Sequence, residues 1–169
     1  MTRDSLTGLY NHTTTKDLLN NAAGLARRHN APLAFAMIDI DHFKSVNDTY
    51  GHATGDRVIK SLSRLLQQRL RKTDIIGRYG GEEFAVALID ADAPRAESIM
   101  NEIRASFEQI RHRVDDREFN VTFSCGLAVF PPNGSVTKFN EAADKALYEA
   151  KRSGRNKVVL ADSKVSSSN

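Results

Sequence analysis

Apolar residues recur along the chain with helical and strand periods, and together these periods predict an α+β fold. At 13–29 they return every three or four residues, which predicts a helix. The run 33–40 is almost wholly apolar and is bounded by turn or charged residues, which is typical of a central strand buried on both faces. The same criteria predict helices around 43–47, 54–70, 94–111 and 136–152, and strands around 74–79, 82–90, 119–130 and 157–161.

The turns between these elements fix the expected architecture. Gly80-Gly81 joins two predicted strands, which is a strong hairpin signal, whereas 50–56 and 131–135 are expected to be loops. The order strand, helix, hairpin, helix, strand predicts a central, largely antiparallel sheet with helices on its faces. Residues 1–162 are expected to form one domain, and the Ser-rich segment 163–169 a disordered tail.

Composition narrows the class of protein. The chain has 169 residues, of which 40% are hydrophobic, and carries a formal charge of +3. A domain of this size folds without a disulfide or a structural metal. Its charges are dispersed, with no run of five like charges, which argues against nucleic acid as a partner and favours a small phosphate ligand.

Three features predict a cytoplasmic location and no membrane contact by this chain. The longest apolar run, 31–38, is far shorter than the roughly 18 residues that span a bilayer. The first residues are polar and lack the apolar segment of a secretory signal. The single cysteine, Cys125, has no Cys or His companions at zinc-site spacing, so we expect a buried strand thiol in a reducing compartment.

Four acidic residues stand at two turns of the predicted sheet. Asp39 and Asp41 end the buried strand, and Glu82 and Glu83 follow the diglycine. Carboxylates in such positions are costly unless a cation neutralises them, and a donor set of oxygens alone favours Mg²⁺ or Mn²⁺. Because side chains alternate along a strand, we expect only one of the two glutamates to join Asp39. The alternative is a plain type I′ turn with solvated glutamates.

Cations suited to phosphate occur elsewhere in the chain. Lys44 follows Asp39 by five residues, and Lys151 and Arg155 are four apart at the end of the last predicted helix. If that helix persists, the latter two share a face. The alternative role of each is to interact with the helix dipole.

Residues 78–84, Arg-Tyr-Gly-Gly-Glu-Glu-Phe, resemble the signature of the GGDEF domain of the diguanylate cyclase family in its GGEEF form. Further matches follow in the family's order at 4–11, 39–44, 47–48, 50–52, 55–56 and 143–156. The resemblance covers about 4–160. One departure is His12, where the family usually has Arg; a change there would alter coupling to an upstream domain or contacts between domains.

This resemblance implies a palm-like fold with a ferredoxin-like core of five strands, and condensation of two GTP into cyclic di-GMP with release of two pyrophosphates. Carried over by position, Asp39, Glu82 and the main-chain carbonyl of Ile40 would hold the divalent ions, Mg²⁺ or Mn²⁺. Glu82 would also be the candidate general base, and Glu83 would assist at or near the metal.

The resemblance also implies a substrate site. Its residues would be Asn47 and Asp56 at the guanine, His52 beside the nucleotide, and Lys44, Lys151, Arg155 and the main-chain amides near His42 and Phe43 at the phosphates. A carboxylate such as that of Asp56 can accept from guanine N1–H and N2–H₂, whereas adenine lacks this donor pair, so we predict selectivity for GTP. Without the resemblance, His52 would be interpreted as a loop histidine and Asn47 as a turn or cap residue.

Control of the activity is implied at a second place. Arg71 and Asp74 form an RxxD sequence separated from Gly80 by five residues, where many family members bind cyclic di-GMP as an inhibitor. Arg71 would contact phosphate and guanine, and Asp74 the base. The alternative is a surface ion pair.

Because one domain binds one GTP and the product contains two, a homodimer is expected, at least transiently. An N-terminal sensor or receiver domain is expected in the full-length protein. Two rival interpretations are a catalytically silent receptor for GTP or cyclic di-GMP, and a nucleic-acid-binding domain. The intact Asp39, Glu82, Glu83 and Arg155 argue against the first, and the lack of a concentrated basic face argues against the second.

Overall fold

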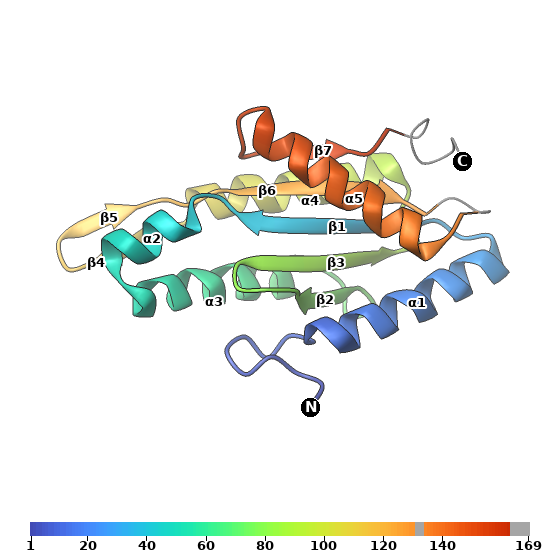
Figure 1. Cartoon of the computed structure of the whole chain (residues 1–169), viewed down its shortest axis with the longest axis horizontal. Helices are drawn as coiled ribbons and strands as arrows, with labels where there is room; N and C mark the ends of the chain where they lie inside the picture. Colours follow the sequence, from blue (N-terminus) through green and yellow to red (C-terminus); the bar gives the residue numbers. More distant parts are fainter. Residues whose placement is uncertain (131–133, 163–169) are drawn as a thin grey trace.

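The long strand that the sequence predicts lies at the centre of a five-stranded sheet in the computed structural model, which describes residues 1–130 and 134–162 (Figure 1). The strands are β1 (Leu33–Ile40), β2 (Ile75–Arg78), β3 (Glu83–Ile89), β4 (His112–Val114), β5 (Arg117–Phe119), β6 (Phe123–Val129) and β7 (Val158–Leu160). The helices are α1 (His12–His29), α2 (Phe43–Tyr50), α3 (His52–Arg69), α4 (Ala93–Gln109) and α5 (Val136–Arg152).

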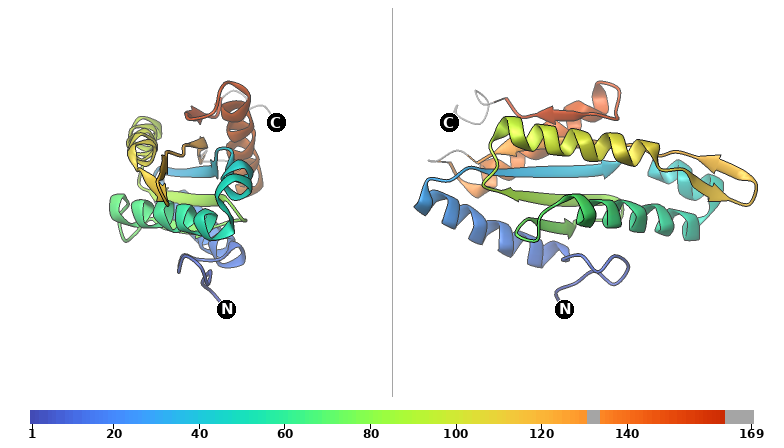
Figure 2. Two further views of the ribbon diagram at one scale, coloured as in Figure 1. Left: turned by 90° about the vertical axis from the view of Figure 1, so that its left-hand side faces the viewer. Right: turned by 180° about the vertical axis from the view of Figure 1, so that it is seen from behind.

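The sheet has the order β2-β3-β1-β6-β7, and only the β6–β7 pair is parallel. The predicted α+β fold with a mostly antiparallel five-stranded sheet is therefore confirmed. Helices α1 and α5 cover one face of the sheet and α3 and α4 the other, as the end-on view in Figure 2 shows.

Burial of β1 explains its position. All eight of its residues are buried. Ala34, Ala36 and Ile38 pack into the core under α3 and α4, whereas Leu33, Phe35 and Met37 pack under α1 and α5. Side chains that alternate between two covered faces require an apolar strand, and β1 is apolar at every position except Asp39.

The predicted loop at 50–56 is wrong. Helix α2 continues to Tyr50 and α3 begins at His52, so that Gly51 alone separates them. Gly51 has a φ of 94°, a backbone conformation that glycine adopts without a steric penalty, and this lets one helix follow the other directly.

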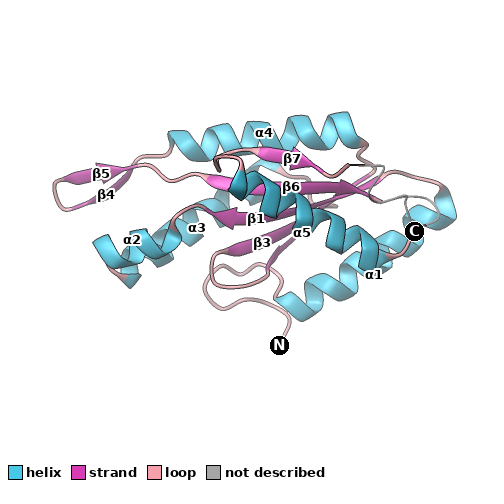
Figure 3. Cartoon of the chain, turned by 45° about the horizontal axis from the view of Figure 1, so that its top comes forward, coloured by secondary structure: helices cyan, strands magenta, loops and turns pink. Residues whose placement is uncertain are grey.

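The predicted strand at 119–130 begins later, at Phe123, and a separate hairpin of β4 and β5 precedes it. This hairpin extends beyond the end of the main sheet, beside α2 (Figure 3). Its position depends on a distant contact, because the Phe119 ring stacks on Tyr50 with centroids 4.1 Å apart. The hydrophobic periodicity of the hairpin segment alone gives no indication that Tyr50 is the partner of Phe119.

The turn that contains Gly80 and Gly81 also has more residues than predicted. Strand β2 ends at Arg78 and β3 begins at Glu83, and neither Gly80 nor Gly81 has a positive φ. A type I′ turn requires positive φ at both central residues, so that alternative is wrong.

Two further expectations concern burial and membrane contact. Cys125 is a free, buried thiol on β6, as predicted, and burial raises its pKa. In the described ranges, 1–130 and 134–162, no helix has the length and apolar character needed to cross a bilayer. The predicted tail 163–169 and positions 131–133 of the predicted loop lie outside the described residues.

Candidate active site

The acidic residues from the two turns meet at one end of the sheet. Asp39, near the end of β1, is paired with Glu83 on β3 and with Ser124 on β6. The next residue, Ile40, donates its N–H to the carbonyl of Glu82 over 3.2 Å. Directly opposed side chains share a face of a sheet, so Glu83 is the glutamate that faces Asp39, while Glu82 lies in the adjoining turn.

Negative charge accumulates at this end of the sheet. The pKa of Glu83 is raised by burial and then by the charge of Asp39; Lys151 opposes this effect, and Glu82 and Asp144 add to it. Asp39 is 8% exposed, and the ammonium of Lys151 on α5 donates to its carboxylate. The ammonium thus partly neutralises a cluster that keeps an excess of carboxylates.

An oxygen-only, strongly negative donor set fits a hard divalent cation such as Mg²⁺ or Mn²⁺. In the predicted site, Asp39, Glu82 and Glu83 would supply the carboxylates and Ile40 a carbonyl. The acids do not enclose an ion on their own: within the described part of the chain, no three His, Cys, Asp or Glu side chains form a ready-made metal cluster. Because Lys151 now bonds to Asp39, a cation at this position requires the ammonium to move.

Asp41 has a different environment, although it lies two residues from Asp39. Its carboxylate accepts from Ser124 Oγ at 2.6 Å, from Thr122 Oγ1 at 2.7 Å and from the main-chain N–H of Asn156 at 3.0 Å. The expectation that a cation must neutralise this acid is wrong, because three uncharged donors already stabilise it.

Asn156 connects the turn after α5 to two other elements. Besides its amide bond to Asp41, its side chain accepts from Arg104 at 2.8 Å and donates to Glu108 at 3.0 Å. Arg155 and Asn156 both have positive φ, 62° and 48°. Arg155 is exposed on this anchored turn, and because α5 ends at Arg152, the condition for a helix face shared with Lys151 is not met.

The start of α2 is next to this turn, because Asp41 directly precedes His42. His42 has a φ of 55° and caps α2 without a side-chain hydrogen bond. The first N–H groups of the helix, from Phe43 onward, have no partner within the helix and attract anions. Lys44 is exposed in the first turn of α2, and the hydrogen bond from the Asn156 amide to Asp41 brings the turn that carries Arg155 close to the start of this helix.

The predicted guanine residues gather where α2 meets α3. Asn47 lies in the last turn of α2, and exposed His52 and Asp56 lie in the first turns of α3. The Asn47 side chain packs against Gly55, the neighbour of Asp56. Its Oδ1 atom is buried and has no hydrogen-bond partner in the described part of the structure.

Sequence reasoning missed the role of Arg78. Its guanidinium donates to the carbonyls of Gly80 at 3.1 Å and Gly81 at 2.8 Å, and to both carboxylate oxygens of Asp4 at 3.2 Å. Burial would raise the pKa of Asp4, but hydrogen bonds from Thr7 and Arg78 lower it overall. Arg78 therefore ties the N-terminal turn to the turn that carries Glu82. The only signal in the sequence was that both residues belong to motif segments.

His12 lies beside the residue that follows Arg78. Its ring is 4.2 Å from that of Tyr79, whose pKa is raised to about 12 by burial and by the charge of Asp144. His12, the position at which the sequence departs from the family, thus contacts Tyr79 next to the diglycine turn rather than the acidic residues.

The candidate inhibitory site lies away from the acids, before β2. The Asp74 side chain is 2% exposed and accepts from the Arg71 amide at 2.9 Å, from the Arg71 guanidinium at 3.3 Å and from the Ile89 amide at 3.1 Å. Arg71 is 46% exposed and borders a pocket of about 290 Å³. Both Arg71 and Asp74 line this pocket, and Asp74, with its three hydrogen bonds, also holds the loop that carries Arg71.

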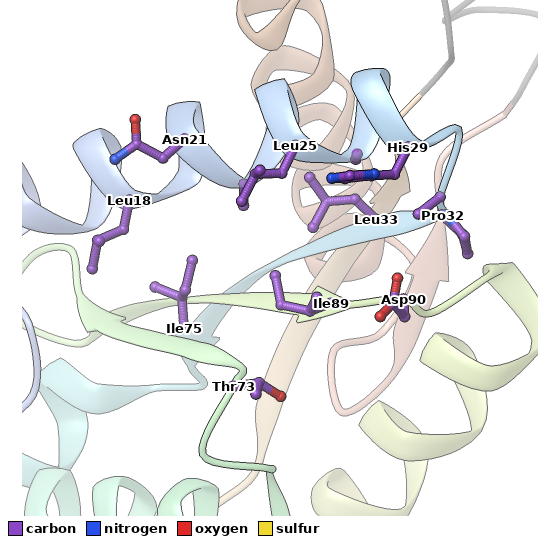
Figure 4. A pocket seen from close by; sticks show the side chains of 13 residues that line it. Leu18, Asn21, Leu25, His29, Pro32, Leu33, Thr73, Ile75, Ile89 and Asp90 are labelled. Atoms are coloured by element: carbon purple, nitrogen blue, oxygen red, sulfur yellow. The ribbon is translucent and has the colours of Figure 1, made fainter.

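A separate pocket of about 530 Å³ lies under α1 (Figure 4). It opens where β1 begins, whereas the acids lie where β1 ends, and Leu18, Leu25, Leu33, Ile75 and Ile89 dominate its walls. Apolar walls of this kind do not suit a triphosphate.

Residues 1–157 match the family model described as diguanylate cyclase, GGDEF domain. This chain belongs to the GGDEF domain family. It is 40% identical over 163 residues to the probable diguanylate cyclase DgcC of Escherichia coli K12, covering 95% of this chain and 43% of the relative. It is 36% identical to the diguanylate cyclase DgcP of Pseudomonas aeruginosa, covering 94% of this chain and 24% of that protein.

Among solved structures, the GGDEF domain of DgcB from Caulobacter crescentus, in complex with c-di-GMP, superimposes with a TM-score of 0.92. It is 36% identical, and the match covers 96% of this chain and 94% of that one. The chain therefore spans less than half the length of these two curated relatives, but nearly all of this solved domain.

Proposed function

We propose that this GGDEF domain is a diguanylate cyclase: it condenses two GTP into cyclic di-GMP and releases two pyrophosphates. The observation that carries the proposal is the convergence of Asp39, Glu82 and Glu83 at the sheet end from which α2 starts. Family membership and the names of the relatives support the same reaction.

In the proposed reaction, a ribose 3′-hydroxyl attacks an α-phosphorus, and negative charge increases on the phosphoryl group and the departing pyrophosphate. Catalysis of this kind depends mainly on positioning and on cationic stabilisation. Asp39, Glu82, Glu83 and the carbonyl of Ile40 would hold Mg²⁺ or Mn²⁺, which supplies positive charge at the triphosphate and lowers the pKa of the hydroxyl. Glu82 is the proposed acceptor of the hydroxyl proton.

The chain's own cations have a second task in this proposal. Lys44, Arg155 and the first amides of α2 bind the phosphates. Lys151 leaves Asp39 when nucleotide binds and joins them, so that one ammonium balances the acid cluster in the free domain and phosphate in the complex. Asn47 and Asp56 bind the guanine, with His52 beside the nucleotide.

The decisive experiment incubates the purified chain with GTP and Mg²⁺, or Mn²⁺ in parallel, and identifies the product by mass spectrometry. We expect cyclic di-GMP from the native chain and none from the Glu82→Ala variant. Binding of GTP or cyclic di-GMP without any product would instead favour the silent receptor. ATP consumed as fast as GTP would contradict the role of Asp56.

A homodimer is part of the proposal, because each domain contributes one nucleotide. If the isolated domain is mainly monomeric, the rate should rise faster than linearly with enzyme concentration. A strictly linear dependence from very dilute enzyme would contradict the dimer.

Product inhibition through Arg71 and Asp74 is a further part of the proposal. The Caulobacter relative was solved in complex with c-di-GMP, which supports binding of this nucleotide here. We expect Arg71→Ala to relieve inhibition by added cyclic di-GMP and to leave the initial rate nearly unchanged. Unchanged inhibition in that variant would remove Arg71 from the site.

A further inference from the structure

An aromatic side chain on the outer surface of α5 is exposed to solvent. Tyr148 is 58% exposed, and among the large hydrophobic residues of the described chain only Met1 is more exposed. The guanidinium of Arg152, one turn later on the helix, lies 5.7 Å from the centre of the Tyr148 ring. Tyrosine and arginine are enriched among the residues that contribute most to the stability of protein interfaces. The pair is therefore a candidate contact with another protein.

Tyr148 borders the candidate active site through its neighbours on the helix. Residues three or four apart lie side by side on a helix surface. Tyr148 follows Asp144 by four residues, and the charge of Asp144 contributes to the raised pKa of Glu83. It precedes Lys151 by three residues, and the Lys151 ammonium donates to Asp39. The exposed ring thus lies at the rim of the acidic cluster.

The proposed reaction brings two of these rims together. Each nucleotide is bound by its own domain, and the attacking 3′-hydroxyl must come within about 3.5 Å of the α-phosphorus of the other nucleotide. The two acidic clusters are then separated by little more than the two nucleotides. The protein surface around one cluster therefore meets the surface of the second domain, and an aromatic ring that leaves water in this contact stabilises it.

The charges beside Tyr148 permit contact with a second copy of the domain. Four exposed residues on the same side of α5 carry two negative and two positive charges: Glu141, Lys145, Glu149 and Arg152. A surface with balanced charge does not repel a copy of itself, and in a two-fold assembly the acids of one copy can pair with the bases of the other. A surface for nucleic acid or an anionic membrane would instead carry an excess of positive charge.

We infer that Tyr148, with Arg152 over its ring, is a contact residue for a second copy of this domain in the assembly that joins two GTP. The inference rests on the proposed function and adds to it the surface through which the two domains meet. Tyr148 acts on how often two nucleotide-loaded domains face each other. Its loss therefore weakens association and leaves both GTP binding and the chemical step intact.

The first test measures the initial rate of cyclic di-GMP formation against enzyme concentration at saturating GTP. For Tyr148→Ala we expect the concentration that gives half of the maximal specific rate to rise about tenfold, because truncation of an interface tyrosine is among the costliest losses in such contacts. At high concentration the variant should reach the native rate per domain. An unchanged concentration dependence, or a lower maximal rate, would overturn the inference.

Binding of 3′-deoxy-GTP distinguishes a contact residue from a structural one. This nucleotide lacks the attacking hydroxyl, so it reports binding to one domain without turnover. Tyr148→Ala should bind it with native affinity and keep the native melting temperature, since more than half of the residue is already in water. A lower melting temperature or weaker binding would assign Tyr148 to the fold of its own domain and overturn the inference.

Leu25 provides the matched control. It is also exposed, at 48%, but lies on α1 beside the pocket at the other end of β1. Leu25→Ala should keep the native concentration dependence. A shift equal to that of Tyr148→Ala would show a general effect of exposed apolar surface and would overturn the inference.

Two further variants test the ring and its cation. Tyr148→Phe keeps the ring and should stay within about twofold of the native concentration dependence. Arg152→Ala should raise the half-maximal concentration about threefold, because the guanidinium over the ring is lost. A phenylalanine variant as weak as Tyr148→Ala would show that the ring is not the contact, and would contradict the inference.

The native chain separates failure of this inference from failure of the proposed function. A native rate that rises faster than linearly, together with an unshifted Tyr148→Ala variant, would overturn the inference alone. A strictly linear native rate would overturn the inference and the proposed dimer. No product from the native chain would overturn the proposed function and the inference with it.

Discussion

Asp39 and Asp41 lie two residues apart on one chain segment, and both are buried, with 8% and 5% of their surface exposed. Asp41 accepts three hydrogen bonds from uncharged donors. Asp39 accepts from the Lys151 ammonium and faces Glu83, whose pKa is raised. The fold itself satisfies one carboxylate, and it leaves the other in an excess of negative charge.

The comparison shows how a buried acid can be assigned a role. A carboxylate surrounded by fixed hydroxyl and amide donors stabilises the elements that supply them. A carboxylate that faces a like charge destabilises the free protein and gains from a cation. Asp41 therefore joins β6 and the turn after α5 to β1, whereas Asp39 is held by the Lys151 side chain alone and could accept a cation if that side chain moved.

The largest expected effect is that of Asp39→Asn on activity. We expect the rate of cyclic di-GMP formation to fall by at least about 100-fold, because a charged ligand for the cation is lost. Stability should change little, because the relief of repulsion from Glu83 offsets the loss of the ion pair with Lys151. Product formation and thermal melting measure the two effects, and a variant that is strongly destabilised would contradict this account of Asp39.

Asp41→Asn should show the opposite balance. An amide cannot accept from three donors as a carboxylate does, so we expect the free energy of unfolding to fall by about 2 kcal/mol. Urea unfolding measures this loss. Residual activity at low temperature, with a higher KM for GTP from a looser Arg155 turn, should remain. Native stability in this variant would show that the three hydrogen bonds contribute little.

Arg78 tests whether the position of the acids depends on their supporting turn. Arg78→Ala should lower kcat about tenfold, since the carbonyls of Gly80 and Gly81 lose a charged donor and the turn with Glu82 loosens. Asp4→Ala should have a smaller effect because Arg78 keeps both carbonyl contacts. Steady-state kinetics on both variants check the order, and a larger loss for Asp4→Ala would reverse it.

The smallest expected effect concerns His112, a half-buried residue away from the acids whose Nε2 atom is buried. Burial and then the charge of Arg57 lower its pKa below 6.5, and its Nε2 has no partner among the described residues. Between pH 6.5 and the lower folded-state pKa, the unfolded chain binds more protons than the folded chain, so stability falls as the pH drops.

His112→Phe should reduce this loss, because phenylalanine does not titrate and can pack between Phe107 and Phe119. Urea midpoints at pH 7.5 and pH 5.0 measure the difference between the variant and the native chain. An equal loss on acidification in both proteins would show that other groups cause it.

Local pattern was enough for most of the fold. The apolar run of β1, the periodic helices and the turn signals predicted the main-sheet strands and the helices in their order along the chain, because each of these signals depends on residues close in sequence. The same pattern missed β4 and β5, because the position of this hairpin depends on the contact between Phe119 and Tyr50. It also predicted a loop at 50–56, where the structure has only Gly51 between α2 and α3.

The sequence by itself determined which residues of this chain carry charge and which strands are buried. Only the tertiary structure decided that Glu83 faces Asp39, that Asp41 is satisfied by Thr122, Ser124 and Asn156, and that Asn47 packs on Gly55. The physical reason is the sequence separation of the interacting residues. Hydrophobic periodicity depends on neighbours a few residues away, whereas strand register and hydrogen-bond partners are set by segments that meet only when the chain has folded.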